Sequence, residues 1–319
     1  METIVERCCG IDVHQATTVV CVLVPDASGR IRKQVRTFPT FTRDLLALRD
    51  WLTELGVTHV GMESTGVYRK PVYTVLEGAF ERLVGNAQHV KNIPGRKNDV
   101  KDSEWLAPLV RHGLIRKSFV LPAPQRTLRE LVRYRRKLVE GRTAEKNRLQ
   151  KLLETANVKL ASVVSNVFGV SGLAKVRVLA VGESEPTKLE ALGRGLLRKR
   201  ERELRLALEG RIDELHRFLL GVQLRRLDRL EEDVAEVEAR IAGLLEPYRE
   251  AHMQLQQIPG VSHVVATVLV AELEPDMSAF GSEGQLVKWA GLCPGNDESA
   301  GKRRSGRVTK GNPLLRRRW

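Results

Sequence analysis

The sequence predicts an α/β domain followed by two mainly helical parts. Short apolar segments with the period of strands fill the first third of the chain, interrupted by stretches of helical period. A long, highly charged stretch of helical period follows, from about Pro124 to Tyr248. The last part, from about Met253, begins with an apolar helical run and ends in a Gly-rich basic segment. We therefore expect domains at residues 1–120, 121–250 and 251–319.

The first expected strand carries an acid in its middle. Cys9, Ile11 and Val13 alternate with Gly10 and Asp12, which is the period of a strand. Asp12 therefore lies on the face opposite Ile11 and Val13, among apolar or small neighbours. This environment is unusual for a surface acid.

Two further strands and a helix are expected next. The strands cover residues 17–24 and 31–38, separated by a turn at 26–29. Thr42 is the expected helix N-cap, with Phe41 and Leu46 as a hydrophobic staple. The side chains expected to be buried by this helix are Leu45, Leu48, Trp51, Leu52 and Leu55.

Later elements supply three more acids. A strand at 57–62 places Glu63 at its end, and a short strand follows at 82–85. Asp99 and Asp102 open the next helix, where an i, i+3 spacing places both on one face. Taken alone, Glu63 could cap a helix, and the two aspartates could be first-turn acids that favour the helix dipole.

A three-strand meander followed by alternating helices and strands is the order of a ribonuclease-H-like fold. In that fold, acids from the first strand, a later strand end and a late helix converge. Clustered carboxylates repel one another unless a cation neutralises them, and Mg²⁺ or Mn²⁺ prefers such oxygen ligands. The sequence therefore predicts a divalent metal site at Asp12, Glu63, Asp99 and Asp102.

Bulk composition favours a polyanionic partner. The 319 residues contain 53 Lys and Arg against 39 Asp and Glu, a formal charge of +14; the alternative is a merely basic protein. The four cysteines lack metal-ligand spacing, and three lie in expected strands as buried thiols of a reducing compartment. No signal peptide or apolar run of membrane length is present, which predicts a cytoplasmic protein.

The middle part contains a heptad pattern and a basic helix. The a and d positions of the heptads are Leu227, Leu230, Val234, Val237, Ile241 and Leu244. They favour a two-stranded coiled coil between subunits, or else an antiparallel pair with the earlier helix, 128–156. That earlier helix is rich in Arg and Lys, and Arg133, Arg136 and Lys137 are its candidate phosphate contacts.

The last part contains two candidate phosphate-binding segments. The segment I-P-G-V at 258–261 resembles a helix-hairpin-helix turn, in which Gly260 presents backbone N–H groups to phosphate, although such turns also occur as plain helix junctions. From Gly301 to Trp319 there are eight Lys or Arg and no acid. Candidate contacts there are Lys302, Arg303, Arg304, Arg307 and Lys310.

A serine beside these cations is a candidate nucleophile for a phosphodiester. Ser299 is one candidate and Ser305, next to Gly306, is its competitor. The alternative is an ordinary loop serine that contacts phosphate.

Motifs at both ends resemble the DEDD transposases of the "IS one-ten" insertion-sequence family. The N-terminal motifs are G-I-D-V-H at 10–14, M-E-S-T-G-V-Y at 62–68 and the segment 86–107. The C-terminal ones are I-P-G-V at 258–261, W-A-G-L-C-P-G at 289–295 and S-A-G-K-R-R-S-G-R-V-T-K-G-N-P at 299–313. The resemblance spans nearly the whole chain.

The resemblance implies a RuvC-like domain whose metal tetrad falls on Asp12, Glu63, Asp99 and Asp102, and a nucleophile at Ser299. It also implies cutting and rejoining of duplex DNA through a phosphoserine link, guided by a structured RNA, in a homo-oligomer. Family members continue in helices past the G-N motif at 311–312, so we expect a truncated C-terminus. A non-catalytic nucleic-acid-binding remnant and a metal-dependent junction-resolving nuclease are the alternatives.

Overall fold

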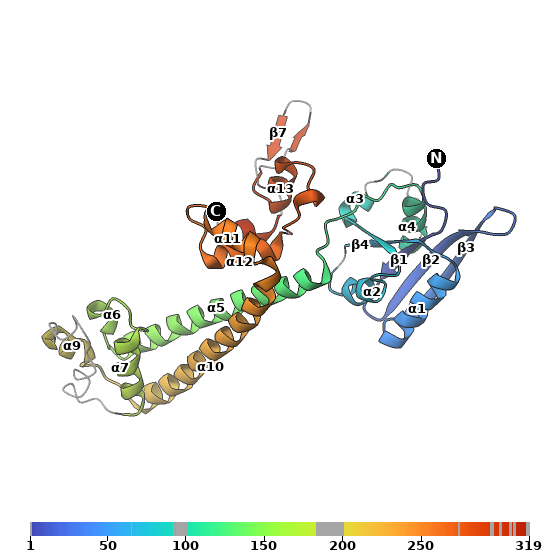
Figure 1. Ribbon diagram of the computed structural model, residues 1–319. Helices are drawn as coiled ribbons and strands as arrows, with labels where there is room; N and C mark the ends of the chain where they lie inside the picture. The colour runs from blue at the N-terminus through green and yellow to red at the C-terminus, as the bar shows by residue number, and fades with distance from the viewer. Residues whose placement is uncertain are drawn as a thin grey trace. The chain divides into compact units, whose positions relative to one another are not determined.

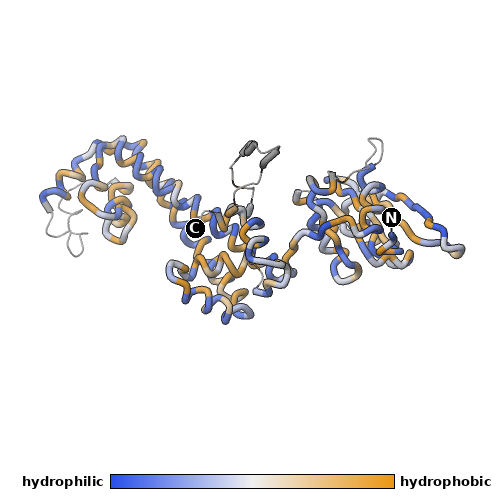
Figure 2. Tube along the Cα trace, turned by 90° about the horizontal axis from the view of Figure 1, so that it is seen from above, coloured by the Kyte–Doolittle hydropathy of each residue, from blue (hydrophilic) through white to orange (hydrophobic). Residues whose placement is uncertain are grey.

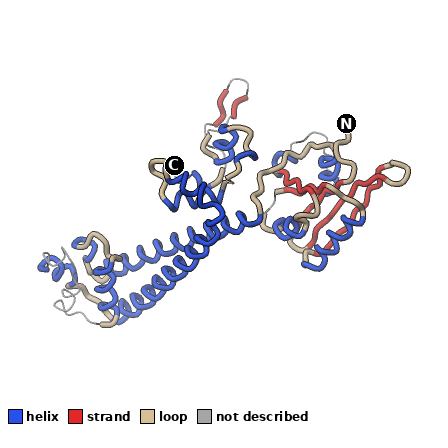
Figure 3. Tube along the Cα trace, in the orientation of Figure 1, coloured by secondary structure: helices blue, strands red, loops and turns tan. Residues whose placement is uncertain are grey.

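A computed structural model describes residues 2–64, 66–91, 93, 101–182, 201–273, 275–293, 297–299, 302–305, 308 and 311–316. The chain forms two compact units, Met1–Val120 and Leu121–Trp319. Figure 3 shows that the described strands belong to the first unit and to one hairpin of the second. No described helix is long and apolar enough to cross a bilayer.

The first unit is built on one five-stranded sheet. Its strands are β1 (Cys8–Val13), β2 (Thr17–Pro25), β3 (Ile31–Pro39), β4 (His59–Glu63) and β5 (Glu81–Gly85). The order is β3-β2-β1-β4-β5. The first three strands form an antiparallel meander, and β4 and β5 continue parallel to β1. This mixed α/β arrangement is consistent with the ribonuclease-H-like order predicted above.

Helices cover both faces of this sheet (Figure 1). One face packs against α1 (Thr42–Glu54) and α2 (Arg69–Val75). The other packs against α3 (Ala87–Lys91) and α4 (Asp102–Arg111). The central strands are therefore buried on both sides, which explains the nearly continuous apolar sequence of β2, whereas the edge strand β3 is largely exposed.

Helix α1 buries the predicted side chains except Leu55, which is half-buried, but its start was predicted wrongly. The helix begins at Thr42, and its N-cap is Phe41 without a side-chain hydrogen bond. Phe41 is 70% exposed and Leu46 is also exposed, so no hydrophobic staple forms. The cap signals were local, whereas packing of the helix on the sheet determined where it starts.

The second unit is mainly helical. Its long helices are α5 (Ala123–Thr155) and α10 (Glu214–Leu245). The shorter elements are α6 (Leu160–Val163), α7 (Val170–Ala180), α9 (Glu201–Leu208), η2 (Glu246–Tyr248), α11 (Arg249–Gln256), α12 (His263–Glu272), η3 (Met277–Ala279), α13 (Glu283–Ala290), β6 (Asp297–Ser299), β7 (Lys302–Ser305) and α14 (Pro313–Arg316).

Helices α5 and α10 lie side by side (Figure 1). Arg135 pairs with Glu238 near one end and Lys146 with Glu231 further along, so the helices are antiparallel. Both alternate hydrophilic and hydrophobic residues along their length (Figure 2). The chain therefore forms the intramolecular pair that was one of the two interpretations of the heptads.

Two apolar cores occupy different parts of this unit. One joins the C-terminal half of α5 to α6, α7, α9 and the start of α10. The other joins the start of α5 and the end of α10 to α12, α13 and α14. The second core includes residues of α13 and α14, the helices on either side of the Gly-rich segment that carries Ser299.

Candidate metal and nucleic-acid sites

Asp12 and Glu63 lie near the ends of neighbouring parallel strands. The register of β1 and β4 pairs Gly10 with Gly61 and Ile11 with Met62. Asp12 and Glu63 are the next residues on the two strands. Because side chains alternate along a strand, both acids are on the face of the sheet that carries the two glycines.

The two glycines allow α4 to pack very close to this face. A Cβ atom on Gly10 would lie 2.4 Å from both the Ser103 carbonyl oxygen and the Ala107 amide nitrogen. A Cβ atom on Gly61 would lie 2.2 Å from the Val110 side chain. Strands β1 and β4 therefore hold the helix whose first residue is Asp102.

The Asp102 carboxylate lies close enough to Asp12 to influence its ionisation. Burial raises the pKa of Asp12, the positive charge of His14 lowers it, and the negative charge of Asp102 raises it. The Asp12 side chain is 26% exposed, and its Oδ2 lies 3.1 Å from His14 Nε2. Asp12 is thus a half-buried carboxylate with a second acid nearby.

The expected pairing of Asp99 and Asp102 on one helix face is wrong. Helix α4 begins at Asp102, and the preceding Lys101 is extended, with φ −60° and ψ 147°. The i, i+3 spacing therefore falls across the start of the helix instead of within it. Asp99 itself lies outside the described residues.

His14 was missed by the sequence reading, although the motif Asp-Val-His contained a usable signal. His14 directly follows β1 and lies two residues after Asp12, so the alternation of side chains along extended backbone placed it to reach Asp12. The other first-turn acid of α4, Glu104, accepts a hydrogen bond from Lys33 at 2.7 Å. Glu104 is therefore held by β3.

The donor chemistry of Asp12, Glu63 and Asp102 fits a hard divalent cation, because all three offer oxygens and two of them repel each other. Within the described residues, no group of three or more histidine, cysteine or acidic side chains is placed to hold a metal ion. Asp99, the fourth acid of the predicted set, lies outside the described residues.

The basic helix α5 is largely ion-paired. Arg133 donates to both carboxylate oxygens of Glu272, at 2.7 and 2.8 Å. Arg136 and Lys137 both donate to Glu140, at 2.9 and 3.0 Å. Acids from other helices and from α5 itself thus offset its charge, and its role in phosphate binding stays a prediction.

The I-P-G-V segment forms a turn between α11 and α12. Gly260 has φ +87°, and a Cβ atom there would meet nothing within 4 Å. Ser262 caps α12 by accepting from the Val265 amide. A glycine turn at a helix N-terminus is therefore present, as expected both for a helix-hairpin-helix turn and for a plain helix junction.

The Gly-rich segment contains a two-stranded hairpin. Ser299 ends β6, and its register partner is Lys302 at the start of β7. Arg303, Arg304 and Ser305 continue β7. The predicted contacts Arg307 and Lys310 lie outside the described residues.

The five-stranded sheet with its helices forms a mixed α/β unit, consistent with a ribonuclease-H-like fold, and a mainly helical unit follows it. The family model of DEDD-type IS110 transposases matches residues 9–158, and that of the transposase IS116/IS110/IS902 family matches residues 252–319. Together they cover about two thirds of the chain. The chain belongs to the IS110 family of transposases, which confirms the resemblance of its motifs. No curated protein matched the sequence.

Proposed function

We propose that this transposase cuts and rejoins DNA with an acidic metal site in its first unit and a serine nucleophile in its second. The observation that supports the proposal is that Asp12 and Glu63 lie on the face of the sheet against which α4 packs, with Asp102 as the first residue of α4. Asp99 completes the set by resemblance to the family.

Asp12, Glu63, Asp99 and Asp102 would hold Mg²⁺ or Mn²⁺, which supplies electrostatic stabilisation of charge that develops on phosphate oxygens. His14 orients the Asp12 carboxylate through the contact between Nε2 and Oδ2. The close packing of α4 on Gly10 fixes the position of Asp102.

Ser299 is the proposed nucleophile. A bond forms between its Oγ and phosphorus as the bond from phosphorus to the leaving sugar oxygen breaks. The hydroxyl proton passes to a carboxylate of the acidic site, and the leaving sugar oxygen takes up a proton from water. A serine needs such a base, and the nearest histidine in sequence, His263, begins the apolar helix α12. We therefore propose that the acids of one subunit act with the serine of another.

Nucleic acid is the proposed partner of the basic surfaces. The formal charge of +14 supports binding of duplex DNA and a structured guide RNA. On α5, Arg136 and Lys137 share one acid, Glu140, so this group keeps a net positive charge. The Gly260 turn and the cations Lys302, Arg303, Arg304, Arg307 and Lys310 are further proposed contacts.

The nucleophile is tested by denaturing electrophoresis of labelled DNA incubated with the protein, RNA and Mg²⁺. A covalent protein–DNA species is expected from the wild type and from Ser305→Ala, and not from Ser299→Ala. An adduct that persists in Ser299→Ala and disappears in Ser305→Ala would move the role to Ser305.

A junction-resolving nuclease is the second candidate, because the three described acids lie within the first unit alone. It predicts metal-dependent nicking without any covalent species. The same gels separate the two functions, since nicked product without adduct supports the nuclease. The absence of both from a protein that still binds nucleic acid supports a non-catalytic remnant.

A further inference from the structure

Glu272 is a buried carboxylate in an unfavourable position. It is the last residue of α12 and is 0% exposed. The C-terminal end of a helix disfavours negative charge, and a buried charge is costly unless it is paired and hydrogen-bonded. The burial of Glu272 therefore depends on neighbouring groups that pair with its charge and hydrogen-bond its oxygens.

Two residues far apart in the sequence satisfy this carboxylate. Arg133 of α5 forms a two-point ion pair with it, at 2.7 and 2.8 Å. Asn312 donates its Nδ2 hydrogen to Glu272 Oε2 at 2.6 Å. Asn312 Oδ1 also accepts from the Leu314 amide at 3.0 Å, at the start of α14. One acid thus connects α5, α12 and the residues before α14.

The same region brings together the two ends of the Gly-rich segment. A Cβ atom on Gly311 would lie 2.2 Å from both N and Cα of Gly291. Gly291 ends α13 in a left-handed conformation, with φ +76°. Gly291 and Gly311, the described residues on either side of segment 292–310, therefore lie in contact with each other.

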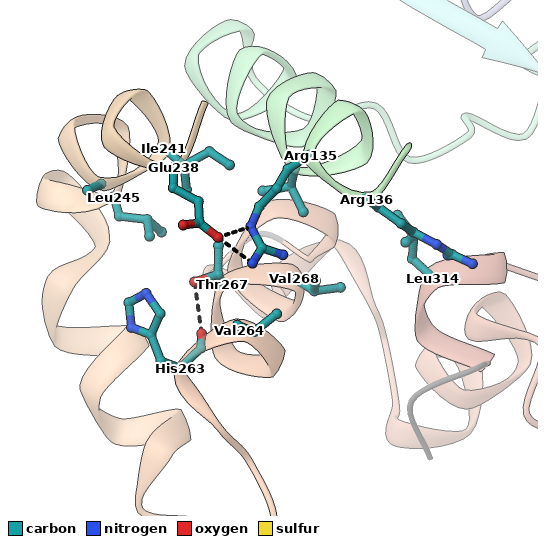
Figure 4. Close-up of a pocket in the computed structure, with 12 residues that line it drawn as sticks. Arg135, Arg136, Glu238, Ile241, Leu245, His263, Val264, Thr267, Val268 and Leu314 are labelled. Carbon is teal, nitrogen blue, oxygen red and sulfur yellow. Dashed lines mark hydrogen bonds and ion pairs between the residues drawn. The ribbon is translucent and has the colours of Figure 1, made fainter. Parts of the chain in front are cut away.

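The apolar packing around α14 leaves a cavity. Leu314 is buried, yet it lines a cavity of about 180 Å³ between α5, α10 and α12 (Figure 4). Beside this cavity, Arg135 of α5 pairs with Glu238 of α10, and within α12 Thr267 donates to the His263 carbonyl oxygen at 2.8 Å. Apolar contact is not directional, so the two hydrogen bonds of Asn312 add a directional restraint at the start of α14.

We propose that Arg133, Glu272 and Asn312 are positioning residues that hold both ends of segment 292–310 against α5. The consequence for catalysis rests on the proposed role of Ser299 at the end of β6. The mechanical part of the proposal does not depend on that role, so it is tested on the protein alone.

Cys293 offers a native probe two residues after Gly291. It is half-buried, whereas the other three cysteines are buried. A nitroxide attached to Cys293 reports local mobility through its electron paramagnetic resonance line shape. Asn312→Asp should add a mobile component, because it places a second carboxylate against Glu272. The swapped pair Asn312→Asp with Glu272→Gln should remove that component, since one carboxylate and one amide are restored.

Asp228→Asn is the matched control, because it disrupts another two-point Arg–carboxylate pair of the same unit, with Arg177. Its line shape should equal that of the wild type. If Asn312→Asp does not fold, Asn312→Ala takes its place under the same criterion. An unchanged line shape in the folded variant, or no recovery in the swapped pair, would overturn the proposal.

The catalytic consequence is then measured separately. Asn312→Asp should slow formation of the covalent species about tenfold or more without changing RNA or DNA affinity, and the swapped pair should recover the rate. If the wild type forms no adduct, the role of Ser299 is refuted. The line-shape result then decides by itself whether Arg133, Glu272 and Asn312 hold the ends of segment 292–310. Weakened nucleic-acid binding as the only defect would overturn the catalytic consequence.

Discussion

Gly10 contacts the backbone of Ser103: a Cβ atom on Gly10 would lie 2.4 Å from the Ser103 carbonyl oxygen. Ser103 follows Asp102 directly, and Asp12 lies two residues after Gly10. One close contact between strand and helix therefore sets the distance between two of the proposed metal ligands.

Gly10→Ala should consequently separate Asp12 from Asp102. The added methyl group meets backbone on α4, which cannot rotate away, and overpacking of this kind costs about 1–3 kcal/mol. Chemical denaturation should show that loss, and calorimetry should show weaker Mg²⁺ binding. Gly243→Ala, where a Cβ atom meets nothing within 4 Å, should be neutral or stabilising. Equal metal affinity in Gly10→Ala would mean that α4 tolerates the displacement.

Removal of the proposed ligands should separate metal binding from folding. In the wild type, Mg²⁺ at about 100 times its Kd should stabilise the fold by about 2.7 kcal/mol. Asp12→Asn with Asp102→Asn should abolish that gain while the metal-free protein becomes no less stable, because the charge of Asp102 raises the pKa of Asp12. Asp50→Asn, on the exposed part of α1, should retain the full gain. Unchanged Mg²⁺ affinity in the double variant would exclude these acids as ligands.

The sequence predicted what local patterns control, and missed what distant partners control. Alternation around Asp12 was enough to place β1, and the element order was enough to predict the sheet. Heptads identify an apolar stripe on α10, but they do not say which helix covers it. The charge run of α5 likewise could not show that Arg133 meets Glu272, because the two are 139 residues apart.

Replacement of Arg133 would leave Glu272 buried without its ion-pair partner, so Arg133 is not a suitable position for testing nucleic-acid binding. Arg136→Ala with Lys137→Ala should instead lower the slope of log Kd against log salt by about 1–2, as expected when one or two phosphate contacts are lost. Glu140→Gln should strengthen RNA binding, because it releases both cations. Filter binding at several salt concentrations measures both, and an unchanged slope would place the RNA elsewhere.

Only Cys293 should react with a maleimide in the folded protein at pH 7. Cys8, Cys9 and Cys21 are buried, and burial raises the pKa of Cys8 to about 12 and that of Cys21 to about 11. Thiolates are the reactive form, so these thiols should react only in denaturant. Mass spectrometry of the labelled peptides checks this, and native labelling of Cys21 would contradict the buried sheet.

The same thiols predict alkaline destabilisation. Their pKa values are higher in the folded state than the ordinary value of 9.0, so the stability they contribute is complete below pH 9. Above pH 9 the unfolded chain loses these protons first, and the free energy of unfolding should fall by about 1 kcal/mol per pH unit for each thiol. Urea denaturation at pH 8 and pH 10 measures the fall, which should be smaller in Cys21→Ala.

A charged residue in the apolar stripe that the heptads form on α10 should unfold the second unit before it affects the association of subunits. Ile241 is buried within the chain in the core that includes Leu128 and Val132 of α5. Ile241→Asp should therefore lower stability by about 4 kcal/mol or more, as a buried unpaired charge does, with loss of helical circular dichroism. Ala239→Asp adds the same charge at an exposed position of α10 and should keep the wild-type signal.

Light scattering on the wild type tests the predicted homo-oligomer separately. A monomer at micromolar concentration would leave the intramolecular pair as the sole role of the stripe, whereas a folded, monomeric Ile241→Asp would restore the intersubunit coiled coil.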